Sequence, residues 1–347
     1  VPDVTFDGEI LKYRPNQTGT WRVGDDVHAM FRINAQGYNS RHSVYMRDRD
    51  PTRRRIAVIG DSYVAAFQVP WNRSFAEVLE DRLGADHTEV FRFGVDGSPL
   101  AQYVYVLEHE VLAYRPDVVI VVLVHNDFLE SFRRVAGRYA KSFMVLDLAG
   151  DRIREPAPRP YDGGWADRIR RLAISRYFLY RQQLTASPLV QAIKQRLFGE
   201  PGAQRIEANV DMNEVQQAGR QITIATDYLF GRLADMSRSA NFRLILVMDA
   251  PRTAADNDVG NSGSNALNEL AARLARKHRL EFVDLRAVFD RHRRDGYTEF
   301  AFATDGHWNE RAHRMVGETL AEYIATHPVE AEQPSAGLLE SASVTHR

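Results

Sequence analysis

Short apolar runs rich in β-branched residues recur along the chain from residue 56 onward. They occupy residues 56–59, 90–93, 118–124, 244–247 and 282–285. Apolar runs of this length without polar alternation are typical of parallel strands that are buried on both faces. The pattern therefore predicts a parallel sheet of about five strands.

Between these runs, the apolar residues are spaced as on one face of a helix. Helical spacing covers residues 75–83, 100–114, 214–239, 265–278 and 310–324. Asn309 is a suitable N-cap for the last of these helices. Strands that alternate with helices predict a doubly wound α/β domain, with a parallel sheet and helices on both of its faces.

Three regions do not follow this alternation. Residues 1–54 are rich in Gly, Asn, Asp and Arg without a sustained period, and we expect an arm laid over a main domain at 55–327. An insertion at about 128–210 predicts a cap over the site, with a hairpin of strands 143–148 and 152–154 and a helix at 165–197. The tail at 328–347 is rich in Glu, Ser and Ala and is predicted to be disordered.

Composition excludes several classes of protein. Lys and Arg total 45 against 46 Asp and Glu, so no overall positive field attracts nucleic acid. The absence of cysteine excludes disulfides, thiolate metal sites and cysteine nucleophiles. No apolar run reaches the roughly 18 residues that span a bilayer. The N-terminus lacks a signal-peptide pattern, and because the chain begins at Val1, a leader or anchor upstream of it remains open.

The first candidate for chemistry is Ser62, in the tetrapeptide Gly-Asp-Ser-Tyr at 60–63. It follows the first predicted strand directly and precedes the start of a helix. A serine at a sharp strand-to-helix turn has an exposed hydroxyl, beside backbone N–H groups that favour negative charge. The same residue types also serve as turn and N-cap residues, so the tetrapeptide alone does not define a site.

Three further polar segments then follow in order. Gly-Val-Asp-Gly at 94–97 comes after the second strand, His-Asn-Asp at 125–127 comes after the third, and Asp-Gly-His-Trp at 305–308 precedes the last helix. All of them lie at carboxyl ends of strands or in equivalent loops, where open parallel sheets bind ligands. The four segments together predict one site at that edge of the sheet.

With these segments in this order, the chain resembles the SGNH hydrolases, also called the GDSL-like lipases and esterases, over residues 55–325. The resemblance implies a flavodoxin-like three-layer sandwich. The residues that give the family its name correspond here to Ser62, Gly97, Asn126 and His307. Gly94 is the alternative to Gly97, which we favour because Val-Asp-Gly-Ser at 95–98 matches the second block of the family better.

Acyl transfer explains these residue types. A nucleophile such as Ser62 must lose its proton in the transition state, and the neutral imidazole of His307 suits that task. The oxyanion needs donors already in place, here the backbone N–H groups of Ser62 and Gly97 and the side-chain amide of Asn126. Asp305 is the nearest acceptor to orient His307. The family more often places this aspartate three residues before the histidine, so a backbone carbonyl is the alternative.

Candidates for substrate contacts are Asp61, Trp308 and Arg252. Packing beneath the last helix is the alternative for Trp308, and a solvated loop position is the alternative for Arg252. His125 stands where many relatives have glycine, and we expect it to be packed or hydrogen-bonded. No metal ligands and no cofactor are predicted.

The sequence predicts a serine-dependent acyl ester hydrolase for O-acetyl esters of carbohydrates or small molecules. An O-acetyltransferase that modifies a bacterial polysaccharide forms the same acyl-enzyme and is the main alternative. The Asp-x-His spacing at 305–307 resembles that of SGNH-like enzymes which acetylate bacterial polysaccharides. The sequence at 31–38 and the presence of the insertion resemble those of bacterial SGNH proteins that carry an N-terminal membrane anchor. This resemblance favours an extracytoplasmic role.

Two other classes remain as alternatives. A metallophosphoesterase also uses Gly-Asp, Asn-Asp and Asp-x-His pieces, but it needs them in a different order. A binding module without catalysis is the other alternative.

Overall fold

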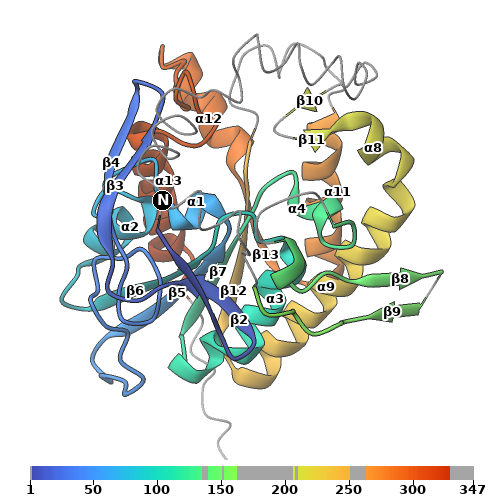
Figure 1. The fold of residues 1–347 in the computed structure, drawn as a ribbon. Helices are drawn as coiled ribbons and strands as arrows, with labels where there is room; N and C mark the ends of the chain where they lie inside the picture. The colour runs from blue at the N-terminus through green and yellow to red at the C-terminus, as the bar shows by residue number, and fades with distance from the viewer. Residues whose placement is uncertain are drawn as a thin grey trace, which may run out of the picture.

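The computed structural model describes residues 2–134, 140–150, 152–161, 206–207, 210–250 and 263–328 (Figure 1). Its centre is a five-stranded sheet in the order β13-β12-β7-β5-β6, and every pair of neighbouring strands in it is parallel. The strands are β5 (Arg54–Gly60), β6 (Thr88–Gly94), β7 (Val118–Leu123), β12 (Arg243–Met248) and β13 (Glu281–Asp284). The fold class predicted from the sequence is confirmed.

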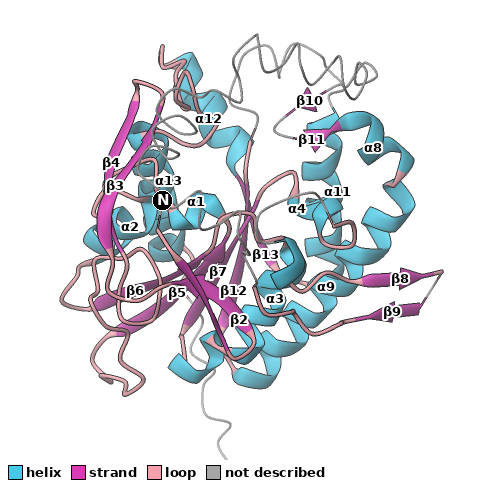
Figure 2. Cartoon of the chain, in the orientation of Figure 1, coloured by secondary structure: helices cyan, strands magenta, loops and turns pink. Residues whose placement is uncertain are grey.

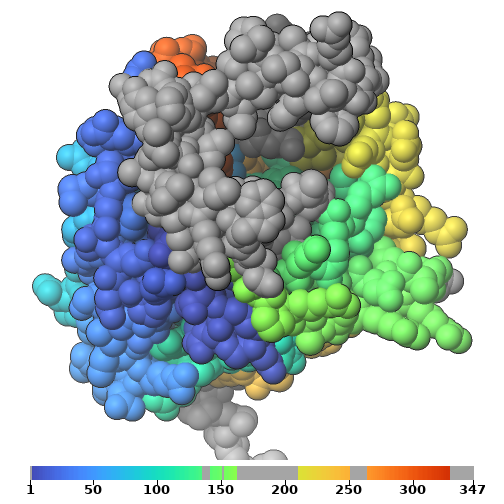
Figure 3. All heavy atoms as spheres, in the orientation of Figure 1, coloured from blue at the N-terminus to red at the C-terminus, as the bar shows by residue number. Residues whose placement is uncertain are grey.

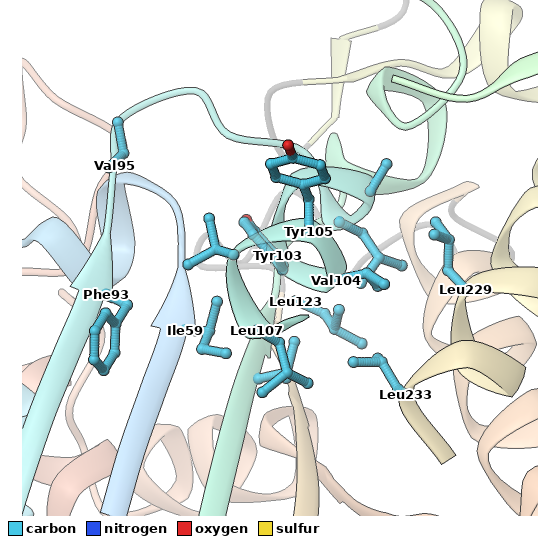
Figure 4. Close-up of a cluster of buried hydrophobic side chains, with 14 of the residues drawn as sticks. Ile59, Phe93, Val95, Tyr103, Val104, Tyr105, Leu107, Leu123, Leu229 and Leu233 are labelled. Atoms are coloured by element: carbon cyan, nitrogen blue, oxygen red, sulfur yellow. The ribbon is translucent and has the colours of Figure 1, made fainter. Parts of the chain in front are cut away.

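Helices cover both faces of this sheet (Figure 2). On one face lie α2 (Phe75–Leu83), α12 (Leu285–Arg294) and α13 (Glu310–Thr326). On the other lie α3 (Leu100–His109), α9 (Gly219–Ala240) and α11 (Gly263–His278). Because side chains alternate along a strand, Val58 of β5 packs in the first layer and Ile59 in the second. Figure 4 shows Ile59 and Leu123 beneath the helices of the second layer.

Several predicted elements differ in detail. The helix predicted at 100–114 ends at His109, and a 3-10 helix at Val111–Tyr114 follows it. The helix predicted at 214–239 is divided into α8 (Met212–Gln217) and α9. The sequence pattern missed α12, since its only buried residues are Leu285, Val288 and Phe289 in an otherwise charged segment.

The N-terminal region contains regular structure that the sequence pattern did not predict. Strands β1 (Val4–Asp7) and β2 (Ile10–Tyr13) form one antiparallel hairpin, and β3 (Thr18–Val23) and β4 (Val27–Arg32) form another. Buried and exposed residues alternate along β4, the signature of a strand with one covered face. Figure 3 shows this part of the chain, in blue, as a continuous portion of the molecular surface.

The predicted insertion is described only in part. Its hairpin is present as β8 (Asp147–Ala149) and β9 (Arg152–Arg154), but the apolar residues 143–146 before it are buried without forming a strand. Two short strands, β10 (Ile206–Glu207) and β11 (Val210–Asp211), pair near its end. The helix predicted at 165–197 and the tail beyond 328 lie outside the described residues. No described helix is long and apolar enough to cross a bilayer.

Candidate active site

Ser62 is the first residue of α1 (Ser62–Ala65), a single turn that follows β5 directly. Asp61 caps this turn, because its carboxylate accepts a hydrogen bond of 2.9 Å from the backbone N–H of Tyr63. The turn ends at Ala66, which has a left-handed φ of 51°. The sharp change of direction leaves the Ser62 side chain partly exposed at the carboxyl end of the sheet.

His307 contacts both Ser62 and Asp305. Its Nε2 lies 2.7 Å from the Ser62 Oγ, and its Nδ1 is hydrogen-bonded to Asp305 Oδ1. The same carboxylate oxygen accepts the backbone N–H of His307 at 3.0 Å. The aspartate therefore folds back on its own loop, which is how a spacing of two residues still brings carboxylate and imidazole together. Since Nδ1 contacts a carboxylate, the proton belongs there and Nε2 faces Ser62 as an acceptor.

Asp305 remains a carboxylate in this environment. Burial raises its pKa, but the hydrogen bonds and charge of His307 outweigh that effect, so the pKa of Asp305 is lowered overall. Gln68 adds a long hydrogen bond of 3.5 Å from its Nε2 to Asp305 Oδ2. An ionised Asp305 favours the imidazolium that forms when His307 accepts a proton.

Gly94 and Gly97 have different surroundings. Gly97 is exposed in the loop after β6, with a left-handed φ of 73°, and an added Cβ would lie 4.0 Å from Phe143. Gly94 is buried, and a Cβ there would lie 2.3 Å from the backbone nitrogen of Ala65. Gly94 therefore allows α1 to approach β6 closely, whereas Gly97 is the glycine whose backbone borders open space.

The close approach at Gly94 leads to a prediction on stability. Gly94→Ala is expected to lower the free energy of unfolding by about 1–3 kcal/mol, because the new methyl group overlaps backbone atoms that cannot rotate away. Chemical denaturation measures the difference. Gly219→Ala in α9 is the matched control, because no atom lies within 4 Å of the added Cβ. Equal stability of the two variants would contradict the packing role of Gly94.

Asn126 is partly exposed at the N-cap position of α4 (Asp127–Glu130). The loop that carries it is fixed by Asp127, which is fully buried. The Asp127 carboxylate accepts hydrogen bonds of 2.8 Å from the Val124 N–H and of 2.8 Å from the Tyr103 hydroxyl. Burial raises the pKa of Glu130 to about 7, with a hydrogen bond from Asn126 acting in the opposite direction.

A buried polar network that the sequence analysis missed supports the third and fourth segments. The side-chain Nδ2 of Asn268 in α11 donates a hydrogen bond of 2.9 Å to the Asp249 carbonyl, and Asn268 Oδ1 lies 2.8 Å from His125 Nε2. The indole N–H of Trp308 donates a hydrogen bond of 2.9 Å to the Asp249 carboxylate. Burial raises the pKa of Asp249 to about 7. The position of Asp249 directly after β12, at the carboxyl edge of the sheet, is the signal that could have identified it.

The three residues predicted to contact substrate differ in outcome. Trp308 is fully buried against Tyr63 and Phe75, so its prediction as a pocket-lining residue is wrong. The structure instead agrees with the alternative, in which Trp308 packs beneath α13. Asp61 is almost fully buried and holds the turn at Ser62. Arg252 lies outside the described residues. His125 is buried and hydrogen-bonded, as its sequence context led us to expect.

The fold and the contacts around Ser62 define an α/β protein in which serine, histidine and aspartate meet at the carboxyl edge of a parallel sheet. The chain belongs to the GDSL-like lipase/acylhydrolase family, whose model matches residues 58–315. The resemblance inferred from the four sequence segments is thereby confirmed. No group of three or more histidine and acidic residues suited to a metal ion occurs within the described ranges.

Solved structures of low sequence identity are similar to this chain. A member of the lipolytic G-D-S-L family from Veillonella parvula is 14% identical, with a TM-score of 0.41, covering 79% of this chain and 99% of that one. The acetyl xylan esterase AlAXEase is 12% identical, with a TM-score of 0.44, covering 78% and 99%. A mutant of the acetyl-xylooligosaccharide esterase Axe2 from Geobacillus Stearmophilus is 12% identical, with a TM-score of 0.44, covering 80% of this chain and 97% of that one. No curated protein matches the chain.

Proposed function

We propose that this protein is a serine-dependent esterase that removes O-acetyl groups from carbohydrates or small molecules through an acyl-enzyme on Ser62. The observation that carries the proposal is the 2.7 Å contact between His307 Nε2 and Ser62 Oγ, with Asp305 on the opposite ring nitrogen. Membership of an acylhydrolase family supports the reaction class. The likeness of the Asp-x-His segment to that of polysaccharide-acetylating enzymes supports acetyl as the acyl group, whichever nucleophile then receives it.

In the first half of the proposed reaction, Ser62 Oγ attacks the carbonyl carbon of the ester while His307 Nε2 takes its proton. The carbonyl oxygen becomes an oxyanion, which the backbone N–H groups of Ser62 and Gly97 and the amide of Asn126 stabilise. The intermediate then collapses, the bond to the leaving alcohol breaks, and the imidazolium of His307 gives its proton to that oxygen. The acyl group remains on Ser62.

In the second half, a water molecule gives its proton to His307 and attacks the acyl-enzyme. Collapse of the second intermediate releases the carboxylic acid and returns the proton to Ser62. Asp305 acts in both halves by holding the Nδ1 proton and by favouring the transient imidazolium. The mechanism needs no group beyond the side chains and backbone of this chain.

An O-acetyltransferase is the second candidate, because a sugar hydroxyl in place of water would use the same acyl-enzyme. The observation that favours it is the two-residue spacing of Asp305 and His307, which resembles that of polysaccharide-acetylating enzymes. The two functions differ only in which nucleophile reaches the acyl-enzyme, and water exclusion governs that choice.

Turnover of a chromogenic acetyl ester, with and without an oligosaccharide acceptor, tests the proposal. We expect hydrolysis that persists in a chelator, together with covalent labelling of Ser62 by a serine-directed phosphonate. Acetyl transfer to the oligosaccharide in preference to water would replace the esterase with the transferase. An absence of both turnover and labelling would reject the proposed function.

The proposed oxyanion role of Asn126 leads to a separate prediction. Asn126→Ala is expected to lower kcat by about 10²- to 10³-fold with little change in KM, because the amide acts on charge that develops only in the transition state. Steady-state kinetics of the acetyl ester measure both constants. Asn213→Ala, at an exposed position of α8, is the control. A loss confined to KM would show that Asn126 binds the substrate instead.

A further inference from the structure

The N-terminal hairpins and the segment after them, residues 4–45, contact the backbone of one site segment, at Asp96, and backbone that flanks two others, at Ala65 and Thr304. We call this part of the chain the N-terminal segment. Its strands form two separate hairpins outside the five-stranded sheet (Figure 1). Three hydrogen bonds from this segment reach residues that are far away in the sequence. Each of these residues lies close in sequence to a proposed catalytic residue or oxyanion donor.

The most direct of these contacts comes from Tyr13, at the end of β2. Its side chain is buried, with 1% exposed. The backbone N–H of Asp96 donates a hydrogen bond of 3.0 Å to the Tyr13 hydroxyl. Asp96 immediately precedes Gly97, the glycine proposed as an oxyanion donor. The hydroxyl of Tyr13 therefore fixes the peptide next to the one whose N–H is proposed to face the oxyanion.

Tyr13 also affects the Asp96 side chain. Burial raises the pKa of Asp96 to about 6, and the charges of Asp61 and Asp305 act in the same direction. His307 and the hydrogen bond from Tyr13 act against this rise. The hydroxyl therefore helps to keep a carboxylate ionised within the electrostatic reach of the proposed base.

The N-terminal segment holds the nucleophile turn as well. Asn39, also buried, donates a hydrogen bond of 2.8 Å from its Nδ2 to the carbonyl of Ala65, the last residue of α1. Phe67 follows this turn, and its ring is surrounded by rings of the segment at centroid distances of 4.9–5.6 Å. Those rings belong to Tyr13, Trp21 and Phe31.

A third contact reaches the histidine loop. The carboxylate of Asp26, in the turn between β3 and β4, accepts a hydrogen bond of 3.0 Å from the Thr304 N–H and a second one from the Thr304 hydroxyl. Gly24 lies against the same threonine, because a Cβ there would be 2.8 Å from Thr304 Oγ1. Thr304 immediately precedes Asp305, so the contact fixes the start of the loop that carries the proposed base.

We infer that the N-terminal segment is a built-in positioning element of the active site, and that Tyr13 is a positioning residue for the reaction through Asp96 and Gly97. The inference rests on the proposed esterase function. A segment that only stabilised the fold would need no hydrogen bonds to the peptides beside the proposed oxyanion donor and base. Tyr13 contacts no reacting atom, so its effect passes through the loop at 95–98.

Tyr13→Phe tests the inference in the full chain, since it removes one hydroxyl and keeps the buried ring. We expect kcat for the acetyl ester to fall about tenfold with KM within about twofold of wild type. Without the Tyr13 hydroxyl the pKa of Asp96 rises, which leaves less negative charge near His307 to favour its imidazolium, so the acidic limb of the kcat profile is expected to move to lower pH. Melting temperature is recorded for each variant.

Tyr38→Phe is the matched control. Tyr38 is equally buried in the same segment, but its hydroxyl donates a hydrogen bond of 2.6 Å to Glu110 at the end of α3. This control is expected to lose stability and to keep the wild-type kcat and pH profile. Equal effects of the two variants on kcat, or no effect of Tyr13→Phe, would overturn the positioning role.

Asp26→Ala provides a second test that does not depend on a buried position, because Asp26 is exposed. Loss of its contact with Thr304 is expected to lower kcat about threefold without a change in KM. Wild-type kinetics in both Asp26→Ala and Tyr13→Phe would reject the inference. Failure of the proposed function is a distinct result, since wild type itself would then show neither turnover nor phosphonate labelling of Ser62.

Discussion

Replacing Ser62 with alanine is expected to lower kcat for acetyl ester hydrolysis by about 10⁴-fold or more. The reason is that Ser62 Oγ is the atom proposed to form the bond to the acyl group. Without it, His307 Nε2, which lies 2.7 Å from this oxygen, has no nucleophile to deprotonate. The oxyanion donors remain, so a small residual rate over water is expected. Steady-state kinetics and loss of phosphonate labelling measure the change.

The control for this variant is Ser74→Ala. Ser74 is fully buried, unlike the partly exposed Ser62, and it donates a hydrogen bond to the carboxylate of Glu77 at the start of α2. Ser74→Ala is expected to lower the melting temperature and to leave kcat and labelling at wild-type levels. Full activity of Ser62→Ala would refute the acyl-enzyme mechanism, and labelling at another serine would relocate the nucleophile.

The sequence was sufficient to predict the five strands of the sheet because each contains a short run that is rich in β-branched or aromatic residues. Residues such as Ile120 and Val121 of β7 are buried on opposite faces, so no polar alternation obscures them. It did not predict β1 to β4, whose strands are short and, in β3, nowhere fully buried. It also missed α12, because three buried apolar side chains do not identify a helix when most of the other residues of the segment are charged.

The site was predictable where its residues occur in local segments. Ser62 begins the turn α1 directly after β5, and Asp305 and His307 lie in a loop at the same carboxyl edge of the sheet. Parallel strands bring such segments together. Contacts between distant segments were not predictable in the same way. The hydrogen bond between Tyr13 and Asp96 joins residues 83 positions apart, and no local pattern marks either one. The contact between Asp26 and Thr304 spans 278 positions.

The distinction between the two glycines also required coordinates. Gly94 and Gly97 lie in one tetrapeptide, and the sequence left both open as oxyanion glycines. Their difference depends on what surrounds each backbone, namely the Ala65 nitrogen against Gly94 and open space beside Gly97. Trp308 is a similar case, because burial by α2 and by Tyr63 decides its role and neither adjoins it in sequence.

Replacing His307 with alanine is the second large effect, with an expected loss in kcat of about 10⁴-fold or more. Without the imidazole, no neutral base contacts Ser62 Oγ, and the leaving alcohol has no proton donor. Added imidazole is expected to restore part of the rate, since the deleted ring leaves space beside Ser62 and Asp305. Ser62→Ala gains nothing from imidazole. The measurement is the dependence of kcat on imidazole concentration in each variant.

His42→Ala is the control, because His42 also pairs with a carboxylate, Glu80, at 2.6 Å and lies in the N-terminal segment. It is expected to keep the wild-type kcat, which separates loss of a histidine–carboxylate pair from loss of the base. Removal of the His307 ring also removes the side-chain hydrogen bond and the charge that lower the pKa of Asp305, while the backbone N–H of residue 307 and Gln68 remain, so this pKa rises. A depressed carboxyl pKa stabilises the fold above the pKa of the unfolded chain, and this contribution is lost as pH falls through the folded value. His307→Ala is therefore expected to lose that contribution at neutral pH and to show weaker destabilisation on acidification than wild type. A variant with wild-type turnover would show that another group removes the proton from Ser62.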